Sequence, residues 1–172
     1  MRPALALCAA LFAGLLDAQT ANPLTTAVTE RFNRLRLDFE ESADLMPAEK
    51  YGFRLTDSQR SFGEWIAHAA TGNYNFCAAI RSEKAPEAVR RLAGLKTKPE
   101  LSQALKESFT YCADTLKQTE DQKALASQAA VRGMINLVSS GNEHYGNIVG
   151  YMRTNNLVPP STTRAERKQQ KQ

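Results

Sequence analysis

The chain has 172 residues, of which 42% are hydrophobic and 23% are charged, and its formal net charge is +4. This length suits one domain with its own hydrophobic core, and the composition excludes wholesale disorder. Residues 162–172 carry +3 of the charge, so the folded part is near +1 and no basic stripe for nucleic acid remains.

Residues 1–21 have the pattern of a secretory signal peptide. A short positive start, residues 1–3, precedes an apolar run over residues 4–16, and small and polar residues follow. The apolar run is too short to span a membrane as a helix, so we expect cleavage between residues 18 and 21. The mature protein is then exported to the periplasm or the extracellular space, with no stable membrane insertion. An uncleaved membrane anchor is the alternative interpretation.

Residues 22–160 have helical periodicity, and no segment alternates with the period of two that is typical of a strand. Long helices are predicted at about 23–45, 62–82, 99–117 and 124–154, with a short helix near 86–95. The expected apolar stripe of the last helix consists of Val131, Met134, Ile135, Val138, Tyr145, Ile148, Val149 and Met152. Gly146 and Gly150 on the same helix are expected to allow close helix contact. Four long amphipathic helices in one domain predict an all-α four-helix bundle.

The remaining residues, 161–172, are rich in lysine, arginine and glutamine. Such a composition is typical of a solvated, disordered end. The sequence therefore divides into a signal peptide at 1–21, a helical domain at 22–160 and a basic disordered tail at 161–172.

Two cysteines remain after the predicted cleavage, because Cys8 lies in the signal peptide. Cys77 and Cys112 fall on neighbouring predicted helices. In an oxidising compartment they can form a disulfide, and two small buried thiols are the alternative; the pattern does not decide between them. Neither cysteine has the adjacent histidine or the C-x-x-C spacing that favours a reactive thiol.

The only two histidines, His68 and His144, each lie on a predicted helix that must face the core. In a four-helix bundle, sites are built in the core from side chains on facing helices. The two imidazoles therefore form a candidate metal or acid–base pair. The alternative is that each is a hydrogen-bonded core residue.

Two stretches of the sequence resemble the DinB/YfiT-like family: residues 46–53 with 61–68, and residues 143–153 with Pro159-Pro160. The resemblance covers about 25–160. It implies a four-helix bundle with up-down-down-up helix order. It also implies a divalent metal held by three histidines, one from the second helix and an H-x-x-x-H pair from the last. Several characterised relatives are metal-dependent thiol transferases or isomerases that use low-molecular-weight thiols.

The sequence departs from this ligand pattern at one position. His68 matches the second-helix histidine and His144 matches the second member of the last pair, but the first member is Ser140. A serine hydroxyl is a poor ligand, so a divalent ion such as zinc, nickel or iron should bind only weakly. Glu64, four residues before His68, is the alternative third ligand. Glu143 points about 100° away from His144 around the helix and is a poorer candidate.

Two functions are compatible with the family resemblance and with the missing histidine ligand. The first is an exported, weak metal-dependent enzyme of thiol transferase type that takes a small-molecule thiol or another small ligand. The second is a non-catalytic ligand-binding or interaction module that has lost the metal. Ser140 favours the second slightly. A homodimer is compatible with both.

Overall fold

The structure is a computed structural model that describes residues 22–170, so the predicted signal peptide lies outside the described residues. All the regular structure in this range is helical, as predicted. The helices are α1 (Pro23–Leu45), α2 (Phe62–Ile80), α3 (Ala88–Leu92), α4 (Lys98–Lys117), α5 (Asp121–Leu125), α6 (Gln128–Thr154) and α7 (Pro160–Gln169), with a 3-10 turn at Ala48–Lys50. No helix within 22–170 combines the length and the apolar character that crossing a bilayer requires.

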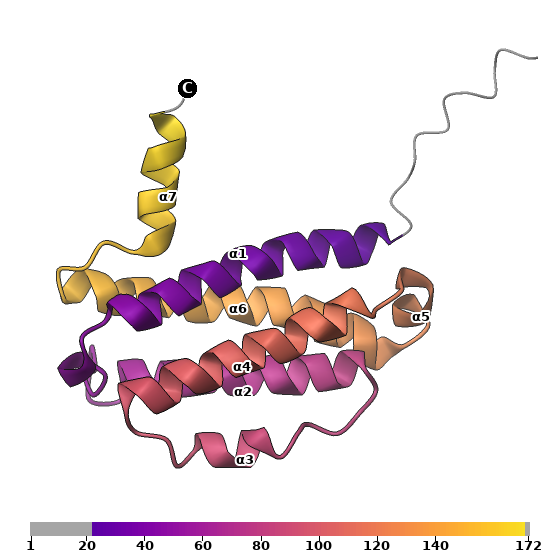
Figure 1. Cartoon of the computed structure of the whole chain (residues 1–172), viewed down its shortest axis with the longest axis horizontal. Helices are drawn as coiled ribbons and strands as arrows, with labels where there is room; N and C mark the ends of the chain where they lie inside the picture. Colours follow the sequence, from indigo (N-terminus) through magenta and orange to yellow (C-terminus); the bar gives the residue numbers. More distant parts are fainter. Residues whose placement is uncertain (1–21, 171–172) are drawn as a thin grey trace, which may run out of the picture.

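The four long helices lie side by side, two running in one direction and two in the opposite direction (Figure 1). α1 and α6 run one way, whereas α2 and α4 run the other way. α2 packs most extensively against α6 and α4, and α1 packs against the same two helices. α1 and α2 are therefore diagonal to each other, and the core lies between all four helices. Its largest fully buried side chains include Phe32, Phe39, Phe62, Ile66, Leu105, Met134, Ile148 and Tyr151.

The start of each of the last three long helices is fixed by a local hydrogen-bonding residue. Ser61 and Glu64 form a capping box at α2, and Thr97 and Glu100 form one at α4. The Ser127 hydroxyl accepts from the Ala130 amide at the start of α6. These side chains satisfy amides that have no partner within the first helical turn, so they set the residue at which each helix begins.

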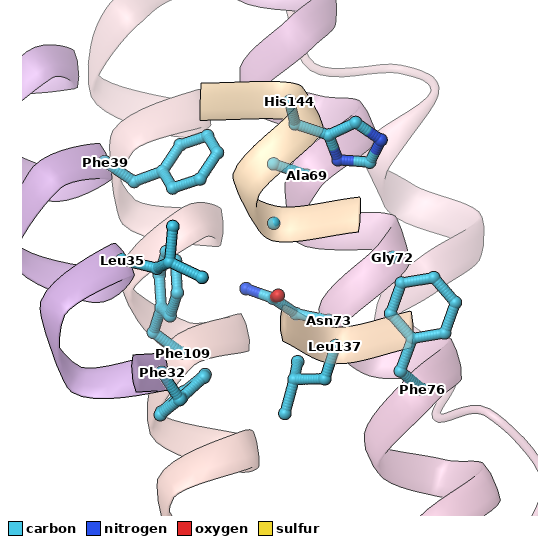
Figure 2. A pocket seen from close by; sticks show the side chains of 11 residues that line it. Phe32, Leu35, Phe39, Ala69, Gly72, Asn73, Phe76, Phe109, Leu137 and His144 are labelled. Atoms are coloured by element: carbon cyan, nitrogen blue, oxygen red, sulfur yellow. The ribbon is translucent and has the colours of Figure 1, made fainter. Parts of the chain in front are cut away.

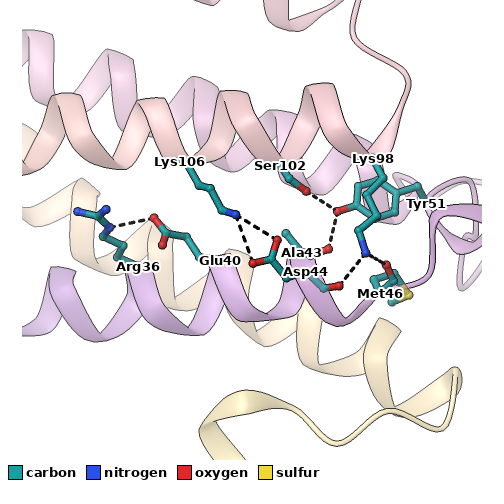
Figure 3. A network of polar contacts seen from close by, with 9 residues as sticks. All are labelled: Arg36, Glu40, Ala43, Asp44, Met46, Tyr51, Lys98, Ser102 and Lys106. Carbon is teal, nitrogen blue, oxygen red and sulfur yellow. Dashed lines mark hydrogen bonds and ion pairs between the residues drawn. The ribbon is translucent and has the colours of Figure 1, made fainter.

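Contacts with α4 close the C-terminal end of α1 (Figure 3). The ammonium of Lys98 donates to the carbonyls of Asp44 and Met46 at 2.7 and 2.8 Å. The hydroxyl of Tyr51 donates to the carbonyl of Ala43 at 2.7 Å and lies 3.0 Å from the hydroxyl of Ser102. Burial raises the pKa of Tyr51 to about 12. The carbonyls left over at the helix end thus receive donors, and α1 is fixed against α4.

A disulfide joins α2 to α4. Cys77 and Cys112 are bonded, their Cα atoms are 5.4 Å apart, and 35 positions separate them in the sequence. Both residues are completely buried. The structure thereby selects the bridge over the two free thiols that the sequence left open.

The predicted last helix, 124–154, is in fact two helices. α5 ends at Leu125 and α6 begins at Gln128, because Ser127 adopts an extended backbone and caps the new helix. The predicted stripe also included Ile135, which is 57% exposed, and it omitted Leu137, which is buried. The buried face passes through Met134, Leu137, His144 and Ile148, spaced three to seven apart, and Ile135 lies about 100° from Met134 around the helix.

The close helix approach occurs at a different glycine from those expected. A Cβ atom at Gly133 would lie 2.7 Å from the carbonyl oxygen of Phe76 and 2.8 Å from Cγ1 of Ile80. A Cβ at Gly146 would meet nothing within 4 Å, and one at Gly150 would make only an ordinary contact with Leu55. Gly133 is therefore the residue that lets α6 approach the backbone of α2.

The prediction of a disordered tail is wrong for residues 161–169, which belong to α7. Pro160 occupies the first turn of this helix, where a missing amide costs nothing. The guanidinium of Arg164 pairs with the carboxylates of Asp38 and Glu41 on α1. The composition suggested disorder because it does not show these contacts with a distant helix.

Candidate histidine site

His68 lies about two helical turns beyond Ser61, the residue that caps α2. The carboxylate of Glu64 accepts from the amide of Ser61 at 2.7 Å, and the hydroxyl of Ser61 accepts from the amide of Glu64. The same carboxylate pairs with Arg54 at 2.9 Å. The hydrogen bond from the Ser61 amide is the main cause that lowers the pKa of Glu64. Glu64 is thus held by the helix cap and Arg54, and the structure does not bring it to the histidines.

The two histidines meet across the interface of α2 and α6, as predicted. Their ring centroids are 4.7 Å apart. His144 is buried, with 9% of its surface exposed, whereas His68 is half-buried. Among residues 22–170, neither imidazole forms a hydrogen bond. Neither ring therefore has, within this range, the protein hydrogen-bond partner that the alternative of a hydrogen-bonded core histidine expects.

Trp65 and Arg60 complete the surroundings of the pair. The indole ring lies 5.7 Å from the imidazole of His68 and 5.5 Å from that of His144. Its Nε1 is buried and has no hydrogen-bond partner among residues 22–170. The guanidinium of Arg60 lies over the indole, 5.1 Å from the ring centroid, which is a cation–π contact. The site therefore contains an indole N–H donor without an acceptor beside two imidazoles.

The surroundings keep both imidazoles neutral near pH 7. Burial is the main cause that lowers the pKa of His68, and Arg60 adds to it. Burial also lowers the pKa of His144, and the neighbouring His68 lowers it further. Glu143 acts on both in the opposite direction. A neutral imidazole has a free nitrogen that can accept a proton or bind a metal.

A small cavity lies on the core side of His144 (Figure 2). Its volume is about 10 Å³, and its lining is mostly apolar. Figure 2 shows His144 and Phe39 at one end and Phe32 and Leu137 at the other. That volume is at the limit of what one water molecule needs. The core beneath the histidines therefore has no room for a buried substrate.

The residues present do not fit a three-ligand metal centre. Ser140 lies one turn before His144 and is half-buried, but its hydroxyl is a poor metal ligand. Glu64 is held by the helix cap. Within the range that the structure describes, no three His, Cys, Asp or Glu side chains form a group that could hold a metal ion. Among residues 22–170, the histidine pair has no third side chain of a type that could complete such a centre.

A family model described as the DinB superfamily matches residues 31–137. The match spans more than half of the chain, and the chain belongs to this superfamily. His68 lies inside the matched segment, whereas Ser140 and His144 lie just beyond it. No curated protein and no solved structure was found to match the sequence.

The sequence did not predict that Arg60 and Glu143 act on the histidine pair through their charges. Arg60 precedes the cap of α2 and lies five positions before Trp65, which is the one signal that could have placed it over the indole. Glu143 is adjacent to His144 in the sequence, and its charge acts on both imidazoles even though it is not a ligand. A search for ligands alone does not find such residues.

Proposed function

We propose that this protein is an exported module of the DinB superfamily that works by binding or interaction and has lost the three-ligand metal centre of its family. One observation carries the proposal: the His68–His144 pair has no third ligand. The candidate positions hold a serine, Ser140, and a carboxylate that caps a helix, Glu64. The cavity beneath His144, about 10 Å³, supports the same conclusion because it cannot enclose a substrate.

We further propose that the four long helices form the family's up-down-down-up four-helix bundle. The directions of α1, α2, α4 and α6 in Figure 1 support this order. In that arrangement the second long helix and the last one face each other. This is why His68 and His144 still converge although the third ligand is absent.

Metal content tests the loss of the centre. Purified wild-type protein should contain no stoichiometric zinc, nickel or iron by elemental analysis. Ser140→His restores a histidine four residues before His144, where both side chains share a helix face. We expect this variant to retain close to one equivalent of metal. Ser140→His combined with His144→Ala is the matched control and should lose the metal again.

Two results would contradict the proposal. One is a full equivalent of metal in the wild-type protein that disappears in His144→Ala. The other is the absence of any gain in Ser140→His, which would show that the helices do not place the three positions as the family's centre requires.

A second candidate function is supported by the neutral imidazole pair itself. His68 and His144, 4.7 Å apart and uncharged, are in the form that binds a divalent ion, and they would do so weakly. A bound ion would supply acidity to a coordinated thiol, which is the chemistry of a thiol transferase. The test is consumption of a low-molecular-weight thiol and an electrophile in excess zinc or nickel. Activity equal in wild type and in the His68→Ala/His144→Ala variant would reject it.

Export is part of the proposal and has its own support. The Cys77–Cys112 disulfide is typical of a protein that folds in an oxidising compartment. Fractionation of cells that express the full chain should recover it outside the cytoplasm, shortened at the predicted cleavage site. Recovery of the uncut chain in the cytoplasm would reject export, and recovery of the uncut chain in the membrane would favour the anchor.

A further inference from the structure

A second hollow, whose lining includes neither histidine, lies between α1 and α7. α7 follows the end of α6, contacts α1 and projects away from the four long helices (Figure 1). The hollow on one side of their contact has a volume of about 360 Å³. Its lining includes Arg31 and Arg34 from α1 and Arg164 and Lys168 from α7. Four cationic side chains from two helices therefore face one small space.

Partly buried contacts hold α7 in this position. Arg164 pairs with Asp38, which is only 3% exposed, and with Glu41 at 2.7 Å. At the first turn of α7, the hydroxyl of Tyr145 donates to the hydroxyl of Ser161 at 3.0 Å. The Ser161 amide also donates to the Tyr145 oxygen at 3.2 Å. The Arg164–Asp38 pair fixes the position of α7, because breaking it would leave the buried carboxylate of Asp38 without a partner.

Three of the cations in the hollow have no anionic partner. Among residues 22–170, no carboxylate lies within ion-pair distance of Arg31, Arg34 or Lys168. The only carboxylate in the lining is that of Asp38, and it is paired with Arg164. Arg31 makes a hydrogen bond to the side-chain oxygen of Asn142 on α6, which orients it without neutralising it.

We propose that this hollow binds a small ligand that carries a phosphate group. Arg31 and Arg34 are three apart on one face of α1, and a guanidinium offers paired donors that match the oxygens of a phosphate. Lys168 adds a cation from the facing helix, and the Ser161 hydroxyl lies in the same lining. The volume of the hollow suits a small molecule rather than a polymer.

The charge of the whole chain does not suggest this site. Away from the tail, positive and negative side chains nearly balance, so a count along the sequence shows no excess. Folding brings Lys168 of the tail beside two arginines that lie more than 130 positions earlier, and it assigns the nearby acid Asp38 to Arg164. The local field is therefore more positive than the composition indicates.

Titration calorimetry with pyrophosphate and with inorganic phosphate at low ionic strength tests the proposal. We expect wild-type protein to bind pyrophosphate, and Arg31→Gln/Arg34→Gln to lower the affinity at least about tenfold because two charge-assisted donors are removed. Lys117→Gln/Arg132→Gln is the matched control. It removes the same charge from two exposed residues, at the end of α4 and near the start of α6, that are not part of the lining of the hollow, and it should leave the affinity nearly unchanged.

Vesicles distinguish a free ligand from a lipid headgroup. Flotation with vesicles of phosphatidylglycerol and phosphatidylcholine is compared with phosphatidylcholine alone. Binding to anionic vesicles without binding to pyrophosphate, abolished in Arg31→Gln/Arg34→Gln only, assigns the phosphate to a headgroup. An equal loss in the control variant, or no binding to either probe, would overturn the proposal. Circular dichroism checks that all variants keep their helices.

Discussion

The two halves of α2 meet the rest of the protein in opposite ways. In the linked half, residues 73–80, Cys77 is bonded to Cys112 and the Asn73 amide donates to the hydroxyl of Ser108 at 3.1 Å. In the histidine half, residues 62–68, neither the imidazole of His68 nor the buried Nε1 of Trp65 has a hydrogen-bond partner within the described part of the chain. The linked half thus has a covalent bond and a satisfied polar side chain, whereas the histidine half, although Phe62 and Ile66 are fully buried, holds polar groups without a protein partner in the described range.

Removal of the disulfide should have the largest effect. Cys77→Ala/Cys112→Ala is expected to lower the free energy of unfolding by roughly 3–4 kcal/mol, because the bridge closes a long loop in the unfolded chain. Urea denaturation measures the loss, and the mass of the unfolded, non-reduced protein verifies the bridge in wild type.

His68→Ala, in the histidine half, is the comparison variant and should cost less. If it costs more than the double cysteine variant, the linked half is not the main source of stability, and the contrast between the two halves fails.

The next effect concerns the contact of α6 with the linked half. Gly133→Ala places a methyl group 2.7 Å from the carbonyl oxygen of Phe76, and a backbone atom cannot move aside easily. Overpacking of this kind should lower the free energy of unfolding by about 1–3 kcal/mol. Gly146→Ala is the matched control on the same helix, with nothing within 4 Å of the new atom. It should stabilise by up to about 1 kcal/mol, because alanine favours a helix.

Equal effects of the two alanine substitutions in urea denaturation would contradict the close approach at Gly133. A stabilising Gly133→Ala would do the same. In either case α6 would lie farther from the linked half than the structure places it.

The glycine pair shows what the sequence can and cannot predict about the fold. The ranges of α1 and α2 follow from apolar periodicity and were predicted to within two residues. Which glycine admits a neighbouring backbone depends on how α6 is rotated against α2, and periodicity gave Gly146 and Gly150 instead of Gly133. The pairing of Cys77 with Cys112 depends on the same kind of register between helices and was left open.

For the candidate site, too, the sequence predicts which helices meet but not the individual side-chain contacts. The convergence of His68 and His144 follows from two histidines on helices that face one core, and the structure confirms it. The engagement of Glu64 in the helix cap was missed because the same spacing from His68 also suits a ligand. α7 was missed because the Arg164 pairs with Asp38 and Glu41 join residues more than 120 positions apart.

The smallest effect concerns pH and the histidine half. Burial lowers the pKa of His68 and His144 in the folded protein below the 6.5 of a free imidazole. The unfolded chain therefore binds more protons than the folded one as pH falls through about 6.5. The contribution of the two histidines to the free energy of unfolding should be fully present above that pH. It should decline below it, until the imidazoles of the folded protein are protonated as well.

The measurement is the midpoint of urea unfolding between pH 5 and 8 for wild type and for His68→Gln/His144→Gln. The variant keeps polar side chains at both positions but removes the titrating rings, so the difference between the two curves isolates the histidines. The difference between the two urea midpoints should narrow as pH falls, because only the wild type has buried imidazoles that are protonated more readily in the unfolded chain. A difference that stays constant would mean that the two imidazoles reach water freely. The polar groups of the histidine half would then be solvated, and the two halves would differ in exposure to water rather than in hydrogen bonding within the protein.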